Sequence, residues 1–176
     1  WRRLTADEEV EWRRGKLQAV PCALLLNRKR CGRYKGRLIV LGNRWRPDAI
    51  NSVYAGVVSQ TANRAAMVFA ARNGFTIRPF DIGNAFVRAS MGSVRVCVLL
   101  PPSFRDGADD SGRRILLKAL YGLPISPRLW AKTLSADLVK EGWIECKSEP
   151  GVYKKLDDSG KIIAIITVYV DDCVLG

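Results

Sequence analysis

Residues 162–175 read IIAIITVYVDDCVL, and this stretch decides the fold. The nine residues before Asp171 form a strongly apolar run, which predicts a buried strand, and the apolar pattern resumes at Cys173. Adjacent carboxylates such as Asp171 and Asp172 repel each other at the tip of a buried strand and are costly to desolvate. A bound divalent cation would remove that cost. The alternative interpretation is a tight hairpin turn without a metal.

A third carboxylate, Asp81, has a similar setting at the end of a predicted strand over residues 75–80. Taken alone, an aspartate at the end of a strand is ordinary. Carboxylates that converge from separate strands can hold two Mg²⁺ ions about 4 Å apart, which activate a 3′-hydroxyl and stabilise a leaving pyrophosphate. Together, Asp81, Asp171 and Asp172 therefore predict a two-metal phosphoryl-transfer site, with Mn²⁺ as an alternative metal.

The chain contains two other Asp-Asp pairs, Asp109-Asp110 and Asp157-Asp158. Each is followed by Ser-Gly in a polar stretch, a composition typical of turns. We therefore expect these four carboxylates to be structural and only the pair at 171–172 to be functional.

The net charge of +12, from 29 basic and 17 acidic residues, favours an anionic partner, and nucleic acid is the first candidate. The charge is uneven, because residues 1–48 carry 13 of the basic residues and 5 of the acidic ones. A stripe of this kind is the electrostatic footprint expected of a nucleic-acid-binding protein. The alternative is a basic but inert surface.

The five cysteines are far apart and the sequence has no histidine, so neither a zinc site nor a disulfide framework is indicated. Reduced thiols fit an intracellular protein, cytoplasmic or nuclear. The sequence opens without a signal-peptide pattern, and its apolar runs are shorter than the roughly 20 residues of a membrane span, so we expect no membrane partner.

Helical and strand patterns alternate irregularly along the chain, which predicts an α+β fold. Capping signals predict a helix over residues 6–14 and another from Ser59 to Gly74. A third helix is expected to begin at Ser126, with proline at its first position, and to end at Gly142. Two strand pairs are expected to form hairpins: 20–26 with 37–41 around a basic tip, and 151–156 with 161–170. Further strands are expected over 93–100 and 114–120.

Three motifs resemble those of reverse transcriptases, in the expected order: DIGNAF at 81–86, LYGLPISP at 120–127 and YVDD at 169–172. Three others resemble the copia-type retrotransposon branch: YKGRLIV at 34–40, LPPSF at 100–104 and SPRLW at 126–130. The resemblance covers essentially the whole chain. It implies a fold of fingers and palm with an antiparallel sheet, packed helices and a catalytic β-hairpin at the C-terminus.

The resemblance also implies roles for single residues. Asp81 and Asp171 would hold both metals, Asp172 would assist, and the backbone carbonyl of Ile82 would help to hold the metal on the nucleotide side. Four residues would contact the incoming dNTP: Lys35 and Arg37 at its triphosphate, Phe86 against its sugar, and Gly83. Four would lie along the template and primer: Gly122, Ser126, Pro127 and Tyr169.

The sequence departs from the family pattern at two points. The acidic residue usual after the first motif is missing, since residues 88–93 read RASMGS. Pro79 interrupts the strand before Asp81, which suggests a sheet edge or a bulge.

The resemblance assigns residues 1–75 mainly to fingers and 76–176 mainly to palm, with interleaved fingers elements. The thumb, RNase H and integrase segments of a polyprotein would lie outside these residues. We therefore expect inefficient polymerisation by the chain alone.

The leading hypothesis is RNA-directed DNA synthesis on a primed RNA or DNA template. One alternative is a degenerate retroelement fragment that binds nucleic acid without catalysis. A second is an RNA-dependent RNA polymerase, which Phe86 and the valine before Asp171 disfavour. A structural protein would leave the paired carboxylates unexplained.

Overall fold

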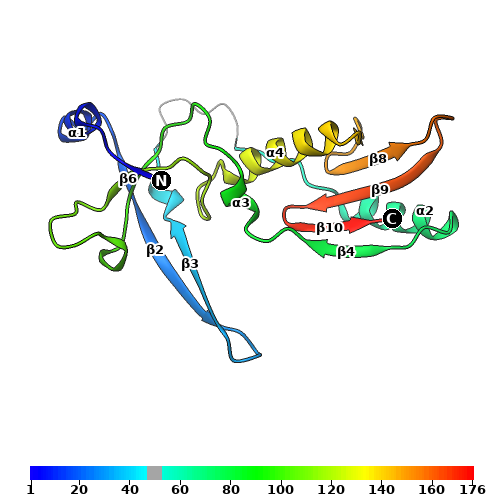
Figure 1. The fold of residues 1–176 in the computed structure, drawn as a ribbon, viewed down its shortest axis with the longest axis horizontal. Coiled ribbons are helices and arrows are strands. Elements are labelled where there is room, and N and C mark those ends of the chain that lie inside the picture. The colour runs from blue at the N-terminus through cyan, green and yellow to red at the C-terminus, as the bar shows by residue number, and fades with distance from the viewer. Residues whose placement is uncertain (47–52) are drawn as a thin grey trace. The chain divides into compact units, whose positions relative to one another are not determined.

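The computed structural model describes residues 1–46 and 53–176, which form two five-stranded sheets with four α-helices (Figure 1). The chain divides into two compact units, and each combines two separate segments. Unit 1 comprises Trp1–Val53 and Phe86–Ser126, and unit 2 comprises Tyr54–Ala85 and Pro127–Gly176. The mixture of helices and strands confirms the predicted α+β class.

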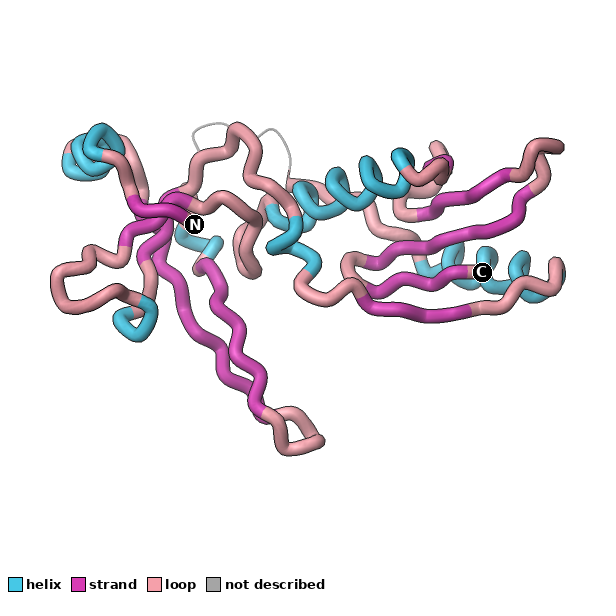
Figure 2. Tube along the Cα trace, in the orientation of Figure 1, coloured by secondary structure: helices cyan, strands magenta, loops and turns pink. Residues whose placement is uncertain are grey.

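The sheet of unit 1 has the strand order β1-β6-β5-β2-β3. The long hairpin of β2 and β3 is visible in Figure 2. Its strands are β1 (Arg2–Arg3), β2 (Ala19–Arg28), β3 (Tyr34–Val40), β5 (Cys97–Leu99) and β6 (Arg113–Ile115). Strand β2 pairs with β5 in parallel, and the other neighbours are antiparallel. Short 3₁₀ helices cover Gly42–Arg44 and Pro102–Phe104. The predicted hairpin of β2 and β3 is confirmed, with longer strands than the sequence indicated.

Helix α1 (Ala6–Arg13) begins where the capping pattern predicted. The hydroxyl of Thr5 accepts a hydrogen bond from the backbone of Glu8, whose carboxylate in turn accepts one from the backbone of Thr5. Arg2 donates two further bonds of 2.7 Å to the same carboxylate. Together the Arg2 guanidinium and the backbone N–H of Thr5 lower the pKa of Glu8 to about 2.

The polar loop before β6 is organised by Asp110, which the sequence predicted to be structural. Its carboxylate pairs with the buried guanidinium of Arg114 and accepts hydrogen bonds from the backbone of Asp106 and Gly112. In unit 2, Asp157 similarly accepts bonds from the backbone of Ser159 and Lys161. Both aspartates therefore stabilise turns.

The sheet of unit 2 has the strand order β4-β10-β9-β8-β7, with all neighbours antiparallel. Its strands are β4 (Arg78–Asp81), β7 (Ile144–Glu145), β8 (Val152–Leu156), β9 (Ile162–Tyr169) and β10 (Asp172–Leu175). Because β4 is an edge strand, Pro79 can occupy it without removing a central hydrogen bond. The sequence had anticipated this placement.

Two helices belong largely to unit 2, α2 (Gln60–Arg72) and α4 (Ser126–Lys140), and the short α3 (Ala85–Arg88) follows β4. Leu134 and Leu138 of α4 pack against a buried cluster formed by Tyr153, Ile166, Val168 and Cys173. This packing sets α4 against residues of β8, β9 and β10. Ala66 and Ala70 form the buried face of α2, whereas Ala65 is exposed.

Several predicted strands are shorter in the structure. In place of the strand expected over 75–80 the structure has only β4. The strand expected over 93–100 is reduced to β5, and the one expected over 114–120 is reduced to β6. Apolar composition misled the prediction for 116–120, since Leu116, Ala119 and Leu120 are buried in an irregular segment. Among the helices of the described ranges, none has the length and apolar character that a membrane crossing requires.

Candidate active site

The turn between β9 and β10 carries Asp171. Tyr169 and Asp172 are paired across the two strands, so Val170 and Asp171 form a two-residue hairpin loop. Val170 has a φ of 61°, an unfavourable angle for a β-branched residue. Such strain persists only where surrounding contacts hold the backbone, and it is frequent at functional sites.

Strand register brings Asp81 beside this turn. Asp81, the last residue of β4, pairs directly with Asp172, the first residue of β10. Directly paired residues of antiparallel strands point to the same face with Cβ atoms roughly 5 Å apart. The next backbone amide, that of Ile82, donates a 2.9 Å hydrogen bond to the carbonyl oxygen of Asp171. Unit 2 thus gathers the three predicted carboxylates at one end of its sheet.

The pKa of the Cys173 thiol is affected by these negative charges. Burial raises its pKa to about 11. The negative charges of the three carboxylates add to the rise, in the order Asp172, Asp171, Asp81. The three carboxylates are therefore close enough to act on one buried group.

The carboxylates are more accessible than the sequence suggested. Asp81 and Asp172 are exposed and Asp171 is half-buried, so the expected desolvation cost is small. The apolar run is itself only partly covered, since Ile163 and Tyr169 within it are exposed. Mutual repulsion of like charges remains as the unfavourable contribution that a cation would relieve.

The donor chemistry of this site fits a hard divalent cation, since carboxylate and backbone oxygens are the ligands that Mg²⁺ prefers. The side chains do not form a ready-made cage. Within residues 1–46 and 53–176, no group of three or more acidic, cysteine or histidine side chains converges closely enough to hold an ion. The strand register brings Asp81 and Asp172 next to each other. Their side chains would have to rotate to coordinate an ion.

Trp130 of α4 is hydrogen-bonded to the backbone of the turn between β9 and β10. Its indole nitrogen donates a 2.7 Å hydrogen bond to the carbonyl oxygen of Val170. The two side chains also border a small apolar pocket, together with Leu134, Tyr153 and Val168. Nothing in the sequence pattern around Trp130 indicates this bond.

In unit 1, the side chains of Phe86, Tyr121 and Arg37 lie close together. The rings of Phe86 and Tyr121 pack edge to face, with centroids 5.0 Å apart. The guanidinium of Arg37 lies 5.7 Å from the centre of the Tyr121 ring. The sequence named Phe86 and Arg37 as nucleotide contacts but missed Tyr121, although it lies next to Gly122 inside the LYGLPISP motif.

The other predicted nucleotide contacts lie apart from this group. Lys35 is exposed on β3, opposite Asn27 of β2. Gly83 lies in the turn between β4 and α3, where a Cβ atom would meet no other atom within 4 Å. The space around Gly83 is therefore open.

Gly122 has a structural reason to be glycine. Its φ is 83°, and a Cβ atom there would lie 2.1 Å from the carbonyl oxygen of Val40. The backbone of Val40 also donates a 2.7 Å hydrogen bond to the carbonyl oxygen of Tyr121. The sequence led us to expect close approach of a template to Gly122, and the structure identifies a protein strand that approaches it.

Ser126 and Pro127 open helix α4, which begins at Ser126 as the sequence predicted. The hydroxyl of Ser126 is fully buried and donates a 2.6 Å hydrogen bond to the carbonyl oxygen of Leu120. Pro127 borders the pocket beneath the turn. Tyr169, in contrast, is exposed at the end of β9, beside Asn63 and Ser59 of a shallow hollow in unit 2.

The model of one protein family, described as reverse transcriptase (RNA-dependent DNA polymerase), matches residues 17–176. Over 144 residues the chain is 31% identical to the retrovirus-related Pol polyprotein from transposon RE1 of Arabidopsis thaliana, a match that covers 81% of this chain and 10% of that protein. Over 156 residues it is 31% identical to the transposon Ty1-BL Gag-Pol polyprotein of Saccharomyces cerevisiae, covering 86% of this chain and 8% of that protein.

A third relative is the retrovirus-related Pol polyprotein from transposon TNT 1-94 of Nicotiana tabacum, 26% identical over 172 residues, with 94% of this chain and 13% of that protein covered. The chain thus spans about a tenth of the length of these curated relatives. The relatives confirm the copia-type resemblance.

Proposed function

Because this chain belongs to the reverse transcriptase (RNA-dependent DNA polymerase) family, we propose that it carries the polymerase site of a retrotransposon Pol polyprotein. The reaction is RNA-directed DNA synthesis, in which a primer 3′-hydroxyl attacks the α-phosphate of a dNTP and pyrophosphate leaves. The single observation that carries the proposal is the register of Asp81 with Asp172, beside the turn that holds Asp171.

In this proposal Asp81 and Asp171 are the principal ligands of two Mg²⁺ ions, with Asp172 and the carbonyl of Ile82 as assisting ligands. When bound, such ions activate the attacking hydroxyl and neutralise charge on the leaving pyrophosphate. The protein contributes position. The bond between Ile82 and Asp171 joins β4 to the turn, so that the ligands keep a fixed separation.

The nucleotide contacts in this proposal come from unit 1 and from the turn after β4. Lys35 and Arg37 bind the triphosphate, and Gly83 lets the nucleotide approach the backbone. Phe86 packs against the sugar, where a ribose 2′-hydroxyl would clash with its ring. Tyr121 supports this selection because it packs against Phe86 on one side and lies near Arg37 on the other.

Along the template and primer we propose Gly122, Ser126, Pro127 and Tyr169. Tyr169 has the accessible surface that a primer contact needs. Ser126 is buried, so its contribution would be indirect, through the position of the loop at 120–125. Gly122 likewise would act by setting the path of that loop.

We further propose that unit 1 corresponds largely to fingers and unit 2 largely to palm. The interleaved segments of the two units support the expectation that fingers elements recur within 76–176. The thumb and the RNase H and integrase segments of the relatives' polyproteins would be partners outside these 176 residues.

Primer extension tests the proposal. The chain, and a longer polypeptide that adds the thumb region, are supplied with a primed RNA template, dNTPs and Mg²⁺. We expect extension by the longer protein and its loss in Asp171→Asn. If neither protein extends the primer while salt-sensitive binding to the primer–template persists, the polymerase proposal fails and a binding module without catalysis replaces it.

A further inference from the structure

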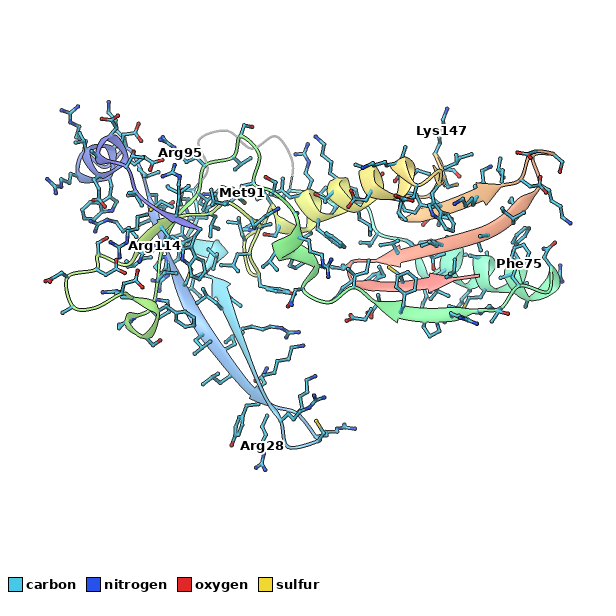
Figure 3. The ribbon with its side chains drawn as sticks, viewed as in Figure 1. Arg28, Phe75, Met91, Arg95, Arg114 and Lys147 are labelled. Carbon is cyan, nitrogen blue, oxygen red and sulfur yellow. The ribbon has the colours of Figure 1, made fainter. Side chains whose placement is uncertain are left out.

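The outer side of strand β3 is an open sheet edge. β3 lies at one end of the sheet of unit 1, and within the part of the chain that the structure describes no strand pairs with its outer side. The hairpin of β2 and β3 extends beyond the other strands of this sheet (Figure 2), and Arg28 lies near its far end (Figure 3). Tyr34 is 78% exposed, and residues 35–37 are exposed as well.

Backbone hydrogen bonds at both ends of the hairpin show which pairs are bonded. The backbone of Lys29 donates a 2.8 Å bond to the carbonyl oxygen of Arg33, and that of Leu41 donates a 2.8 Å bond to the carbonyl oxygen of Pro21. In an antiparallel ladder every second pair of residues exchanges hydrogen bonds. The residues of the pairs in between direct their N–H and C=O groups away from the partner strand.

The register of β2 and β3 then assigns each residue of β3. Lys35 and Arg37 fall in hydrogen-bonded pairs, so their backbone groups point toward β2. Tyr34, Gly36 and Leu38 fall in the pairs between them, so their N–H and C=O groups point outward. The outer edge of β3 thus presents a row of donors and acceptors spaced as a further strand requires.

Val40 confirms this direction, because it lies two residues beyond Leu38 on the same edge. Its backbone N–H donates a 2.7 Å hydrogen bond to the carbonyl oxygen of Tyr121. A polypeptide segment of this chain therefore already occupies one end of the outer edge. The edge from Tyr34 to Leu38 continues the same pattern.

The side chains beside this edge differ between the two faces of the hairpin. Tyr34, Gly36 and Leu38 share one face, because successive residues of a strand alternate. A Cβ atom at Gly36 would lie 3.4 Å from the side chain of Leu26 and 3.7 Å from that of Leu24, so this face is apolar. The opposite face carries Lys35 and Arg37 on β3.

Charge limits which strand can pair here. The sequence contains no acidic residue between positions 12 and 47, so Lys35 and Arg37 have no carboxylate near them within the hairpin. Pairing of this edge with the same edge of a second copy would place like charges side by side, which is unfavourable. Acidic side chains at the neighbouring positions of a different strand would be attracted instead. Nucleic acid does not fit the edge, because phosphates offer acceptors but no donors for the outward carbonyl groups.

We propose that the outer edge of β3 binds an extended acidic segment of a partner protein as an additional antiparallel strand. The partner's residues opposite Tyr34, Gly36 and Leu38 are apolar and exchange backbone hydrogen bonds with them. Its residues opposite Lys35 and Arg37 are Asp or Glu. A segment that alternates apolar and acidic residues meets both requirements. This inference goes beyond the proposed function and does not depend on it.

The test measures binding of short capped peptides to the whole chain by fluorescence anisotropy at one fixed salt concentration. The parent peptide is labelled with fluorescein and has the core Val-Glu-Val-Glu-Val. In the proposed pairing its valine N–H groups point toward β3 and its glutamate N–H groups point away. One variant peptide is therefore N-methylated at the central valine, and a matched control is N-methylated at a glutamate. A third variant has lysine in place of both glutamates.

We expect N-methylation of the central valine to weaken binding by about tenfold or more, because it removes a backbone hydrogen bond to the edge and adds a methyl group that faces it. The control methylated at glutamate should bind like the parent peptide, and the lysine peptide should not bind measurably. No binding of the parent peptide, or equal losses from the two methylations, would overturn the proposal.

Hydrogen exchange measured by NMR locates the bound strand. The parent peptide should slow amide exchange at Tyr34, Gly36 and Leu38, with little change at Lys35 and Arg37, whose amides are already bonded to β2. Binding by charge alone would leave exchange at the three outward amides unchanged, and that result would reject the added strand. A single-stranded oligonucleotide of the same charge is the comparison. If it slowed the same three amides, the alternation would not report strand pairing and the proposal would fail.

Discussion

The indole nitrogen of Trp130 donates a 2.7 Å hydrogen bond to the carbonyl oxygen of Val170, the residue whose φ is positive. Val170 immediately precedes Asp171, so this bond fixes the backbone from which that carboxylate projects. A β-branched residue with positive φ costs about 1–2 kcal/mol, and the contact with Trp130 helps to offset it.

Trp130→Phe should therefore loosen the turn while keeping most of the packing. We expect a loss of about 1–3 kcal/mol in the free energy of unfolding, because the Val170 carbonyl would lack its partner. Urea denaturation measures this loss. Trp143→Phe is the matched control, since Trp143 packs against the same cluster. An equal or larger loss in the control would mean that the hydrogen bond contributes nothing specific.

Divalent-metal affinity should depend on the carboxylates at the end of the unit 2 sheet. We expect Asp81→Asn and Asp171→Asn each to weaken Mn²⁺ binding by at least about tenfold, because each removes a charged oxygen ligand. Titration calorimetry checks this expectation. Asp158→Asn, in an exposed turn, should bind Mn²⁺ like the parent. Unchanged affinity in both site variants would refute the metal assignment.

Sugar discrimination should depend on the Phe86–Tyr121 pair. In a polymerase-active longer chain, Phe86→Val should raise the ratio of kcat/KM for rNTP over dNTP, because space for a 2′-hydroxyl opens. Tyr121→Leu should have a smaller effect in the same direction, since it acts through Phe86.

The double variant Phe86→Val/Tyr121→Leu distinguishes this coupling from independent roles. If Tyr121 acts through Phe86, the two effects are not additive and the double variant resembles Phe86→Val alone. Fully additive effects would show that Tyr121 selects the sugar by another route or supports only the fold.

Two glycines should respond differently to alanine. Gly122→Ala should destabilise the chain by more than about 2 kcal/mol, because the new Cβ atom would collide with Val40 at a positive φ. Gly83→Ala should leave the unfolding free energy nearly unchanged, because its Cβ atom meets open space. Thermal unfolding of both variants provides the measurement, and a stable Gly122→Ala would contradict the close approach that we describe.

Low pH should reduce the stability of unit 1, because Glu8 becomes protonated. Its pKa is lowered from the usual 4.5 to about 2, chiefly by hydrogen bonds from Arg2, so the folded state binds the proton less well than the unfolded state. The resulting stability is fully present above about pH 4.5 and is lost as the pH falls toward 2. Glu8→Gln should flatten the unfolding free energy across this window. An identical pH profile in the variant would exclude Glu8 as its source.

The sequence predicted best where local signals and tertiary packing agree. Thr5 and Glu8 form the capping box that their spacing indicated, and Asp110 stabilises a turn. The hairpin of β9 and β10 also follows from the apolar pattern on either side of Asp171. Strand lengths were harder to predict, because Leu116 and Leu120 are buried without belonging to a strand.

Contacts between segments far apart in the sequence could not be predicted from the sequence. The bond of Trp130 to Val170 spans forty positions, and no periodic pattern encodes it. The pairing of Asp81 with Asp172 could be expected only from the chemistry of a shared metal or from the resemblance. Tyr121 was missed because an aromatic residue beside a glycine is common in loops.

The interleaving of the two units has a consequence for biosynthesis. Strand β10 lies between β4 and β9, so β4 has no neighbour in its sheet until the residues up to Leu175 have been translated. Unit 1 can close once the residues up to Ser126 have left the ribosome, while residues 54–85 await their partners. Pairing across such long sequence separations is slow, and it exposes unpaired edges meanwhile. A nascent chain paused before residue 172 would therefore hold Asp81 on an unpaired strand.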